Sequence, residues 1–389
     1  MSVRILHGDC IELLATLTDE SIDACVTDPP YGIGFMGKEW DTFSPETARA
    51  SKKHAITVGV KGRRNDNPNL TGRRQSPAMS PSQIEYDYTV AGLRGFQAWT
   101  ELWGREVLRV LKPGGHAVVC GAPRAYHRMA CGLEDAGFEI RDCLAWLFGS
   151  GFPKSLNLGE GLGTALKPAH EPIVLARKPF KSTVKANIEK HGTGALNIDA
   201  CRLSLLEGET INGGFHSAVP ADEGWQRPWM ADREKVAGKV DAAMERANAL
   251  GRWPANVALD EFAAMVLDEQ SGITEQRPQT IRRGPRTPEQ NYGGFTNQEG
   301  TTYEVPGDIG GCSRFYYVAK PSREERDMGC HGFQARSGGE ATNRVDGSAG
   351  LNNPRAGANR TGGGRNYHPT VKPVELMRWL VKLVTPING

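Results

Sequence analysis

Apolar residues along this chain recur in two ways, as short continuous runs and at helical spacing. The runs at residues 3–6, 22–27, 116–120, 138–148, 171–177 and 315–320 predict buried strands. Helical spacing predicts helices over residues 8–17, 96–111 and 124–136, the second stopped by a Lys-Pro-Gly-Gly sequence and the third by Gly137. Strands and helices that alternate with short connections favour a doubly wound, three-layer α/β sandwich.

A last helix is predicted over residues 372–385. Pro373 falls at its start, where the missing backbone donor costs nothing. Its apolar positions are expected to pack inward, namely Val374, Met377, Leu380, Val381 and Val384.

Three long stretches have no regular hydrophobic period. Residues 37–82, rich in Gly, Pro, Asn, Arg and Lys, are expected to form a long basic loop. Residues 180–310 break into short pieces, and the Gly/Arg-rich residues 336–366 are expected to be mobile without a ligand. The sequence therefore predicts a core at residues 1–179, an inserted region at 180–310 and a return to the core at 311–389.

With 389 residues the chain is long enough for one large α/β domain and a second unit, and its net charge of +2 excludes little. None of the eight cysteines forms a C-x-x-C pair, and four lie in or beside strand-like segments: Cys10, Cys25, Cys120 and Cys143. They are interpreted as buried, reduced thiols, not as zinc ligands or a disulfide framework. No apolar stretch is long enough to span a bilayer and no signal-peptide pattern opens the chain, so a cytoplasmic protein is expected.

The distribution of charge says more than its total. Asp66 is the only acid in a run that contains Lys52, Lys53, Lys61, Arg63, Arg64, Arg73 and Arg74. Such a run is most often a solvated loop, but it is also suited to contact phosphates. In the inserted region, Trp225, Trp229, Trp253, Tyr292 and Phe295 lie among Arg227, Arg233, Arg282, Arg283 and Arg286. These aromatic side chains either stack on nucleic acid or form the small core of the insert.

The most informative residues follow the predicted strand at 22–27 and read Asp28-Pro29-Pro30-Tyr31. Two consecutive prolines fix φ and remove two backbone donors, so the carbonyls of Asp28 and Pro29 are left to point outward beside one carboxylate. This acceptor group suits an exocyclic amino group, and the ring of Tyr31 adds a stacking face. An enzyme that holds a base swung out of a duplex needs both features. Taken alone, the same residues are equally consistent with a proline-rich turn that ends an ordinary strand.

Further motifs follow in a fixed order. Leu-Lys-Pro-Gly-Gly occupies residues 111–115, His-Pro-Thr-Val-Lys-Pro occupies residues 368–373, and shorter phrases lie at 170–179, 192–198 and 251–256. Together with the Asp-Pro-Pro-Tyr sequence, these motifs closely resemble the β-class of DNA amino-methyltransferases in wording and order. The resemblance covers almost the whole chain, from residue 3 to residue 385.

This resemblance implies a Rossmann-like methyltransferase sandwich with circularly permuted motif order, in which residues 180–310 are the target-recognition region. It implies a catalytic corner formed by Asp28, Pro29, Pro30 and Tyr31. The cofactor is expected to be S-adenosylmethionine, in a pocket lined by Asp9, His368, Pro369, Thr370, Lys372 and Pro373. For Asp9, capping of the helix that follows is an equally weighted interpretation.

The resemblance further implies a substrate, the N6 amino group of one flipped adenine in double-stranded DNA. Aspartate at the first motif position is more typical of enzymes that methylate adenine. The N4 amino group of cytosine is the alternative substrate, and RNA or a protein glutamine is a weaker third candidate substrate. DNA phosphates are expected to contact Lys52, Lys53, Arg63, Arg64, Arg73, Arg74, Arg282 and Arg283. A restriction-modification system or a phage is the expected setting, with a restriction endonuclease or a second copy of the chain as partner.

The chain departs from the family pattern at its end. Family members continue through a strand into a glycine-rich turn that cradles the methionine part of the cofactor, and no such turn occurs in this sequence. In the family fold the corresponding strands are central, so strand 22–27 is expected to have an open edge. The sequence thus predicts a sandwich that is incomplete at its C-terminus, with the missing segment supplied in trans, or a noncatalytic DNA-binding fragment.

Overall fold

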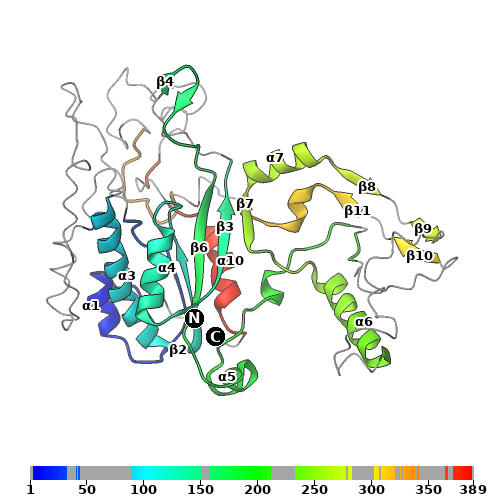
Figure 1. Cartoon of the computed structure of the whole chain (residues 1–389), viewed down its shortest axis with the longest axis horizontal. Coiled ribbons are helices and arrows are strands. Elements are labelled where there is room, and N and C mark those ends of the chain that lie inside the picture. The colour runs from blue at the N-terminus through cyan, green and yellow to red at the C-terminus, as the bar shows by residue number, and fades with distance from the viewer. Residues whose placement is uncertain are drawn as a thin grey trace. The chain divides into compact units, whose positions relative to one another are not determined.

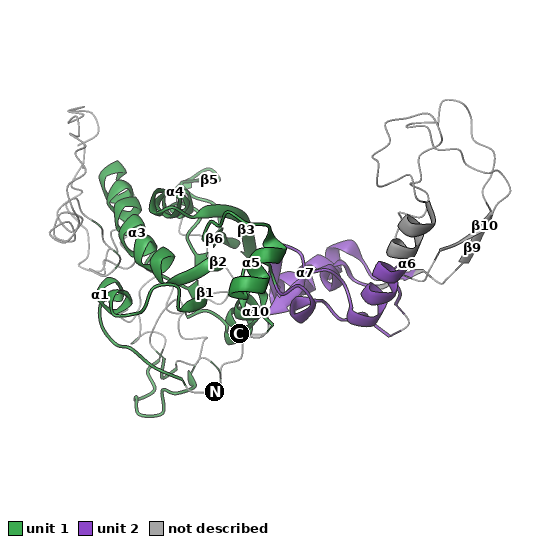
Figure 2. Ribbon diagram, turned by 90° about the horizontal axis from the view of Figure 1, so that it is seen from below, with its two compact units in different colours: residues 1–146, 151–196, 320–389 green, residues 147–150, 197–319 purple. Residues whose placement is uncertain are grey.

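The computed structural model describes residues 3–32, 41, 43, 89–149, 157–207, 209–211, 233–276, 279–282, 302–305, 308–319, 325, 327–337, 340, 364–366 and 371–387. The chain divides into two compact units, coloured separately in Figure 2. Unit 1 comprises residues 1–146, 151–196 and 320–389, and unit 2 comprises residues 147–150 and 197–319. The sequence prediction placed the inserted region at 180–310. No helix in the described parts of the chain is long and apolar enough to cross a membrane.

The sheet of unit 1 runs in the order β1-β2-β6-β3, with β1 at Ile22–Thr27, β2 at Leu111–Cys120, β6 at His170–Arg177 and β3 at Glu139–Leu147. Figure 1 labels β2, β6 and β3, and Figure 2 labels all four strands. β1 and β2 are parallel, whereas β6 runs antiparallel to β2. The predicted strands near 22–27, 138–148 and 171–177 are therefore confirmed. Within the described residues β1 pairs only with β2, in line with the predicted open edge.

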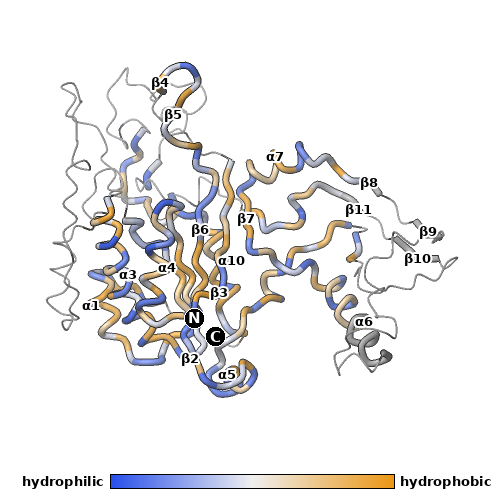
Figure 3. The backbone as a smooth tube through the Cα atoms, in the orientation of Figure 1, coloured by the Kyte–Doolittle hydropathy of each residue, from blue (hydrophilic) through white to orange (hydrophobic). Residues whose placement is uncertain are grey.

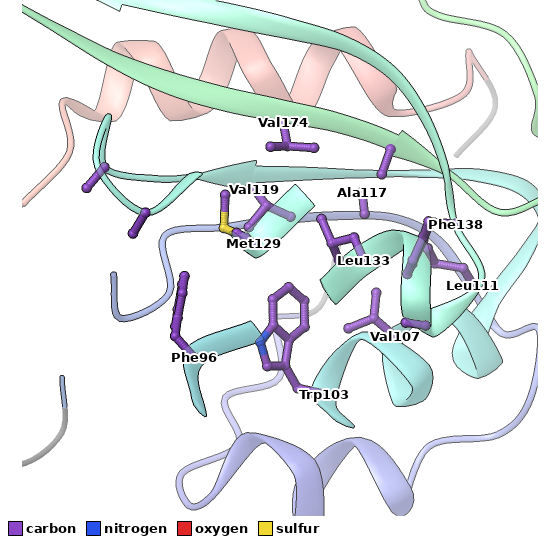
Figure 4. Close-up of a cluster of buried hydrophobic side chains, with 14 residues drawn as sticks. Phe96, Trp103, Val107, Leu111, Ala117, Val119, Met129, Leu133, Phe138 and Val174 are labelled. Atoms are coloured by element: carbon purple, nitrogen blue, oxygen red, sulfur yellow. The ribbon is translucent and has the colours of Figure 1, made fainter. Parts of the chain in front are cut away.

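Helices cover both faces of this sheet. On one face lie α3 (Val90–Val110), capped by the Thr89 hydroxyl, and α4 (Tyr126–Ala136), which ends at Gly137 with φ of 109°. On the other face α10 (Val374–Val384) packs against β1 and β2. Figure 4 shows the buried cluster between the first pair of helices and the strands, with Phe96, Trp103, Met129 and Leu133 pointing toward β2 and β6. The predicted α/β class and its three layers are confirmed.

Hydropathy follows this arrangement (Figure 3), because the strands of the sheet are largely hydrophobic while α5 (Val184–His191) is mostly hydrophilic. Val118, Val119 and Val174 are at most 1% exposed, as expected of strands covered on both faces. The short helix α1 (Cys10–Ala15) packs against α3 and is two residues shorter at its end than predicted.

Three predictions about these elements are wrong. Residues 3–6 form no strand, and Val3 and Ile5 are each 87% exposed. The helix does end before the Lys-Pro-Gly-Gly sequence, with α3 ending at Val110, but the strand predicted to start at residue 116 already starts at Leu111, so that this sequence lies within β2. The extra residues form a bulge: Ile22 pairs with Leu111 and Ala24 already pairs with His116.

The third error concerns the inward face of α10. Leu380 and Val384 are buried as predicted, but Val381 is 45% exposed. The buried face instead includes Leu376, Trp379 and Leu383. The sequence therefore predicted the bounds of this helix but not its rotation about its own axis.

All eight cysteines are free thiols. Cys120 is buried and burial raises its pKa to about 12, while burial raises the pKa of Cys25 to about 11. Cys10 and Cys143 are exposed, so the prediction that all four strand-bordering thiols are buried is wrong for these two.

Unit 2 is built from small pieces. Strands β7 (Val257–Asp260) and β12 (Tyr317–Ala319) are parallel, and α7 (Glu261–Ser271) follows β7 with the Asp260 carboxylate as its cap. Two ribbons pair β8 (Thr274–Gln276) with β11 (Asp308–Gly310) and β9 (Gln279–Arg282) with β10 (Thr302–Val305). A longer helix, α6, spans Arg233–Leu250. β12 lies within the predicted strand at 315–320.

Candidate active site

The strand directions bring two carboxylates that are distant in sequence to one edge of the sheet in unit 1. β1 and β2 are parallel, with Thr27 opposite Val119, so their carboxyl ends meet at this edge. β6 is antiparallel to β2, with Cys120 opposite Ile173, and therefore starts where β2 ends. Asp28 directly follows β1 and Glu171 is the second residue of β6, so both carboxylates reach the same edge.

Lys372, just before α10, joins these two carboxylates. Its Nζ lies 3.0 Å from both Asp28 oxygens, 3.0 Å from Glu171 Oε2 and 2.7 Å from the Tyr31 hydroxyl oxygen. The Tyr31 hydroxyl in turn donates to Asp28 Oδ1 at 2.8 Å, with Glu171 Oε2 at 3.2 Å as a second acceptor. We call Asp28, Tyr31, Glu171 and Lys372 the corner cluster.

Burial and charge set the protonation of the cluster. Burial, together with the charges of Glu171 and Asp28, raises the pKa of the Tyr31 hydroxyl, so it remains a neutral donor. For Lys372, burial acts to lower the pKa, but Glu171 and Asp28 outweigh it and the pKa is raised. Two carboxylates against one ammonium leave the corner cluster with one net negative charge.

The turn that follows Tyr31 is stabilised by residues outside the Asp-Pro-Pro-Tyr motif. Gly32 has φ of 67°, and a Cβ there would lie 2.4 Å from the Phe96 ring. Its N–H donates to Asp41 Oδ1 at 2.8 Å, and Asp41 is fully buried. Only glycine fits this position, so the chain turns sharply after Tyr31 and leaves the corner facing the sheet edge.

The other predicted cofactor residues fall in different places. The Asp9 carboxylate accepts from the backbone N–H groups of Ile11 and Glu12 and so caps α1, the second of its two interpretations. Lys372 belongs to the corner cluster and Pro373 precedes α10. His368, Pro369 and Thr370 lie outside the described residues.

The predicted DNA contacts fall almost entirely outside the described part of the chain. Lys52, Lys53, Arg63, Arg64, Arg73, Arg74 and Arg283 lie outside the described residues, and Arg282 ends β9. Among the aromatic residues of the insert, Trp253 is 65% exposed, with the Arg202 guanidinium 5.1 Å from its ring centroid. An exposed ring backed by a cation suits base stacking better than a core position.

Sequence reasoning missed two residues of the site, Glu171 and Asp41. Glu171 lies in the phrase at residues 170–179 that resembles the family, but its role depends on β6 running antiparallel to β2. Asp41 lies in the stretch expected to be an unpatterned loop, and its burial depends on tertiary contacts. An acid next to a predicted strand start was the only signal for Glu171. In the described part of the chain, no three His, Cys, Asp or Glu side chains gather as metal ligands.

Comparison with known proteins gives a consistent result. A family model described as DNA methylase matches residues 22–389. The type II methyltransferase M.HindIII of Haemophilus influenzae is 29% identical over 211 residues, which cover 50% of this chain and 64% of that protein. M.HinfI, also a type II methyltransferase of Haemophilus influenzae, is 26% identical over 205 residues, which cover 51% of this chain and 46% of that protein.

The matched region thus spans less than two thirds of the length of either relative. Among solved structures, the PvuII DNA methyltransferase, a cytosine-N4-specific enzyme, superposes with a TM-score of 0.26 and 15% sequence identity. That match covers 48% of this chain and 62% of the PvuII chain.

Proposed function

The chain belongs to the N6/N4 DNA methylase family, and we propose that it transfers a methyl group from S-adenosylmethionine to the N6 amino group of adenine in DNA. The observation that carries this proposal is the corner cluster. A proline-locked turn presents a carboxylate and an aromatic ring at the carboxyl end of β1, where the family motif expects them.

The corner suits an amino-group substrate for a chemical reason. An exocyclic amino group has two N–H donors, and the Asp28 carboxylate and the Pro29 carbonyl are two acceptors adjacent in the chain. When both N–H groups are held, the nitrogen lone pair is turned away from the base ring and toward the incoming methyl group. Correct placement of the reacting atoms can account for about 7–11 kcal/mol of a barrier.

S-adenosylmethionine, when bound, supplies a methyl group on a positively charged sulfonium. The corner cluster fits such a donor in charge, because its two carboxylates exceed its one ammonium. Because Asp9 caps α1, the residues proposed to hold the cofactor are His368, Pro369, Thr370, Lys372 and Pro373. Of these, Lys372 is 8% exposed and lies directly beside Asp28.

Asp28 at the first motif position favours adenine over cytosine as the target, with cytosine N4 as the alternative. The target base is proposed to leave the duplex and stack on Tyr31, since neither amino group is within reach of the corner inside a stacked helix. The basic composition of residues 52–74, which suits phosphate contacts, and the exposed ring of Trp253, which suits base stacking, support DNA as the substrate.

Nucleoside mass spectrometry tests this function. DNA from cells that express the parent chain should contain N6-methyladenine, and DNA from cells that express Asp28→Asn should contain at most a hundredth as much. The substitution keeps the size of the side chain but removes its charge, and removal of one preorganised electrostatic group typically costs about 10²–10³ in rate. N4-methylcytosine in place of N6-methyladenine would overturn the adenine assignment.

A further inference from the structure

The Asp28 carboxylate has few acceptor positions left. Each carboxylate oxygen has two lone pairs. Oδ1 accepts from the Tyr31 hydroxyl at 2.8 Å and from Lys372 Nζ at 3.0 Å, and Oδ2 accepts from Lys372 Nζ at 3.0 Å. Among the described residues the carboxylate thus accepts three hydrogen bonds, which leaves one lone pair on Oδ2 free. One free lone pair is what one amino N–H of the substrate requires.

Lys372 is held from two sides. Its side chain is 5% exposed, and its ammonium contacts Glu171 Oε2 at 3.0 Å in addition to Asp28. Its backbone leads into α10, which is fixed by the fully buried Leu376 and Leu380. A buried ammonium with three acceptor groups has little freedom to move, so the Asp28 carboxylate that it grips cannot rotate freely.

Glu171 determines the net charge of the corner cluster. Asp28 and Lys372 alone form a neutral pair, and only Glu171 leaves an excess negative charge at the corner. An amino nitrogen that forms a fourth bond becomes positively charged. A fixed negative charge nearby, in a partly buried site, stabilises that nitrogen more than solvent does.

We propose that Glu171 and Lys372 are positioning residues for Asp28: Lys372 fixes the carboxylate with one acceptor position open, and Glu171 restores the negative charge that Lys372 cancels. This inference rests on the proposed amino-methyltransferase function and extends it to two residues outside the Asp-Pro-Pro-Tyr motif. Neither residue needs to touch the base. Both act on the target nitrogen through Asp28, and for Lys372 this role comes in addition to its proposed place in the cofactor pocket.

A charge-balance cycle of Glu171→Gln, Lys372→Met and the double variant tests the proposal. Glu171→Gln changes the net charge of the corner cluster from −1 to zero, and Lys372→Met changes it to −2. The double variant restores −1. In steady-state kinetics with varied DNA concentration, kcat should fall about 10- to 100-fold in Glu171→Gln, with a smaller change in KM for DNA. The double variant should be at least about tenfold faster than the product of the two single effects predicts.

A second measurement does not depend on activity. Without DNA or cofactor, Lys372→Met should lower the melting temperature, because it leaves two carboxylates facing each other in a partly buried site. The double variant should melt at a higher temperature than Lys372→Met. Additive changes in both kcat and melting temperature would overturn the proposal.

Glu139→Gln is the matched control. Glu139 accepts from Arg177 at 2.7 Å at the start of β3, so this variant also removes a carboxylate from a partly buried ion pair of the same sheet. It should leave kcat unchanged. If the parent is active, Asp28→Asn is inactive and Glu171→Gln is fully active, this inference alone is refuted. If the parent methylates no DNA, the proposed function is refuted. In that case the melting temperatures still decide whether Glu171 and Lys372 are energetically coupled.

Discussion

At the scale of single residues, burial changes the chemistry of His116 more than any charge partner does. This side chain is 4% exposed on β2. Burial, followed by the nearby charges of Arg177 and Arg141, lowers its pKa from 6.5 to about 4. The folded protein therefore keeps the imidazole neutral at a pH where the unfolded chain binds a proton.

The stability of the protein should consequently fall in mild acid. The unfolded chain binds the His116 proton below about pH 6.5 and the folded chain only near pH 4, so the stabilisation is fully present above pH 6.5 and is lost as the pH falls. Between pH 7 and pH 5 the free energy of unfolding should drop by about 2 kcal/mol from this group. Urea titrations of the parent and His116→Gln at both pH values measure it. An equal drop in both proteins would contradict this assignment.

At the scale of elements, the sequence was informative where local pattern decides and uninformative where pairing decides. Gly137 ended α4 as predicted, because a left-handed cap is a local property. The Lys-Pro-Gly-Gly sequence lies within β2 despite its poor strand propensity, because pairing with β1 overrides that propensity. The role of Glu171 depends on the antiparallel direction of β6, which no local pattern encodes.

Helix α10 shows the same limit. Nearly all of its positions are apolar except Glu375, Arg378 and Lys382, so the pattern defines a helix but fits more than one buried face. Tertiary packing selects the face that carries Leu376, Trp379 and Leu380.

A neighbouring pair of substitutions checks this face. Leu380→Ala removes a fully buried side chain and should cost about 2–5 kcal/mol of the free energy of unfolding. Val381→Ala changes a side chain that is 45% exposed and should stay within about 0.5 kcal/mol of the parent. Denaturant unfolding followed by circular dichroism measures both. Similar costs for the two variants would show that the assigned face is wrong.

At the scale of the whole molecule, the proposed function needs a surface for DNA as well as a catalytic corner. Unit 1 supplies the corner, whereas the basic run at residues 52–74 lies outside the described residues. Its sequence alone makes it the strongest candidate for phosphate contacts. Each phosphate contact releases condensed counterions, so such contacts can be counted from the salt dependence of binding.

Replacement of two arginines in this run should change that salt dependence. For Arg63→Ala/Arg64→Ala, the slope of log K against log salt concentration should become shallower by about 1.8, at about 0.9 per lost contact. Lys185→Ala/Lys190→Ala, which removes two exposed charges from α5, should leave the slope unchanged. Fluorescence anisotropy with a labelled duplex provides the measurement. An unchanged slope in the arginine variant would mean that the run is a solvated loop.

The most direct test of the account is the rate of methyl transfer to DNA by purified protein in a single turnover, compared between the parent and Asp28→Ala. We expect the parent to methylate adenine and Asp28→Ala to be at least about 100-fold slower, while the far-ultraviolet circular dichroism of Asp28→Ala stays that of a folded protein. If Asp28→Ala methylates DNA as fast as the parent, the corner at the end of β1 is not the methylation centre.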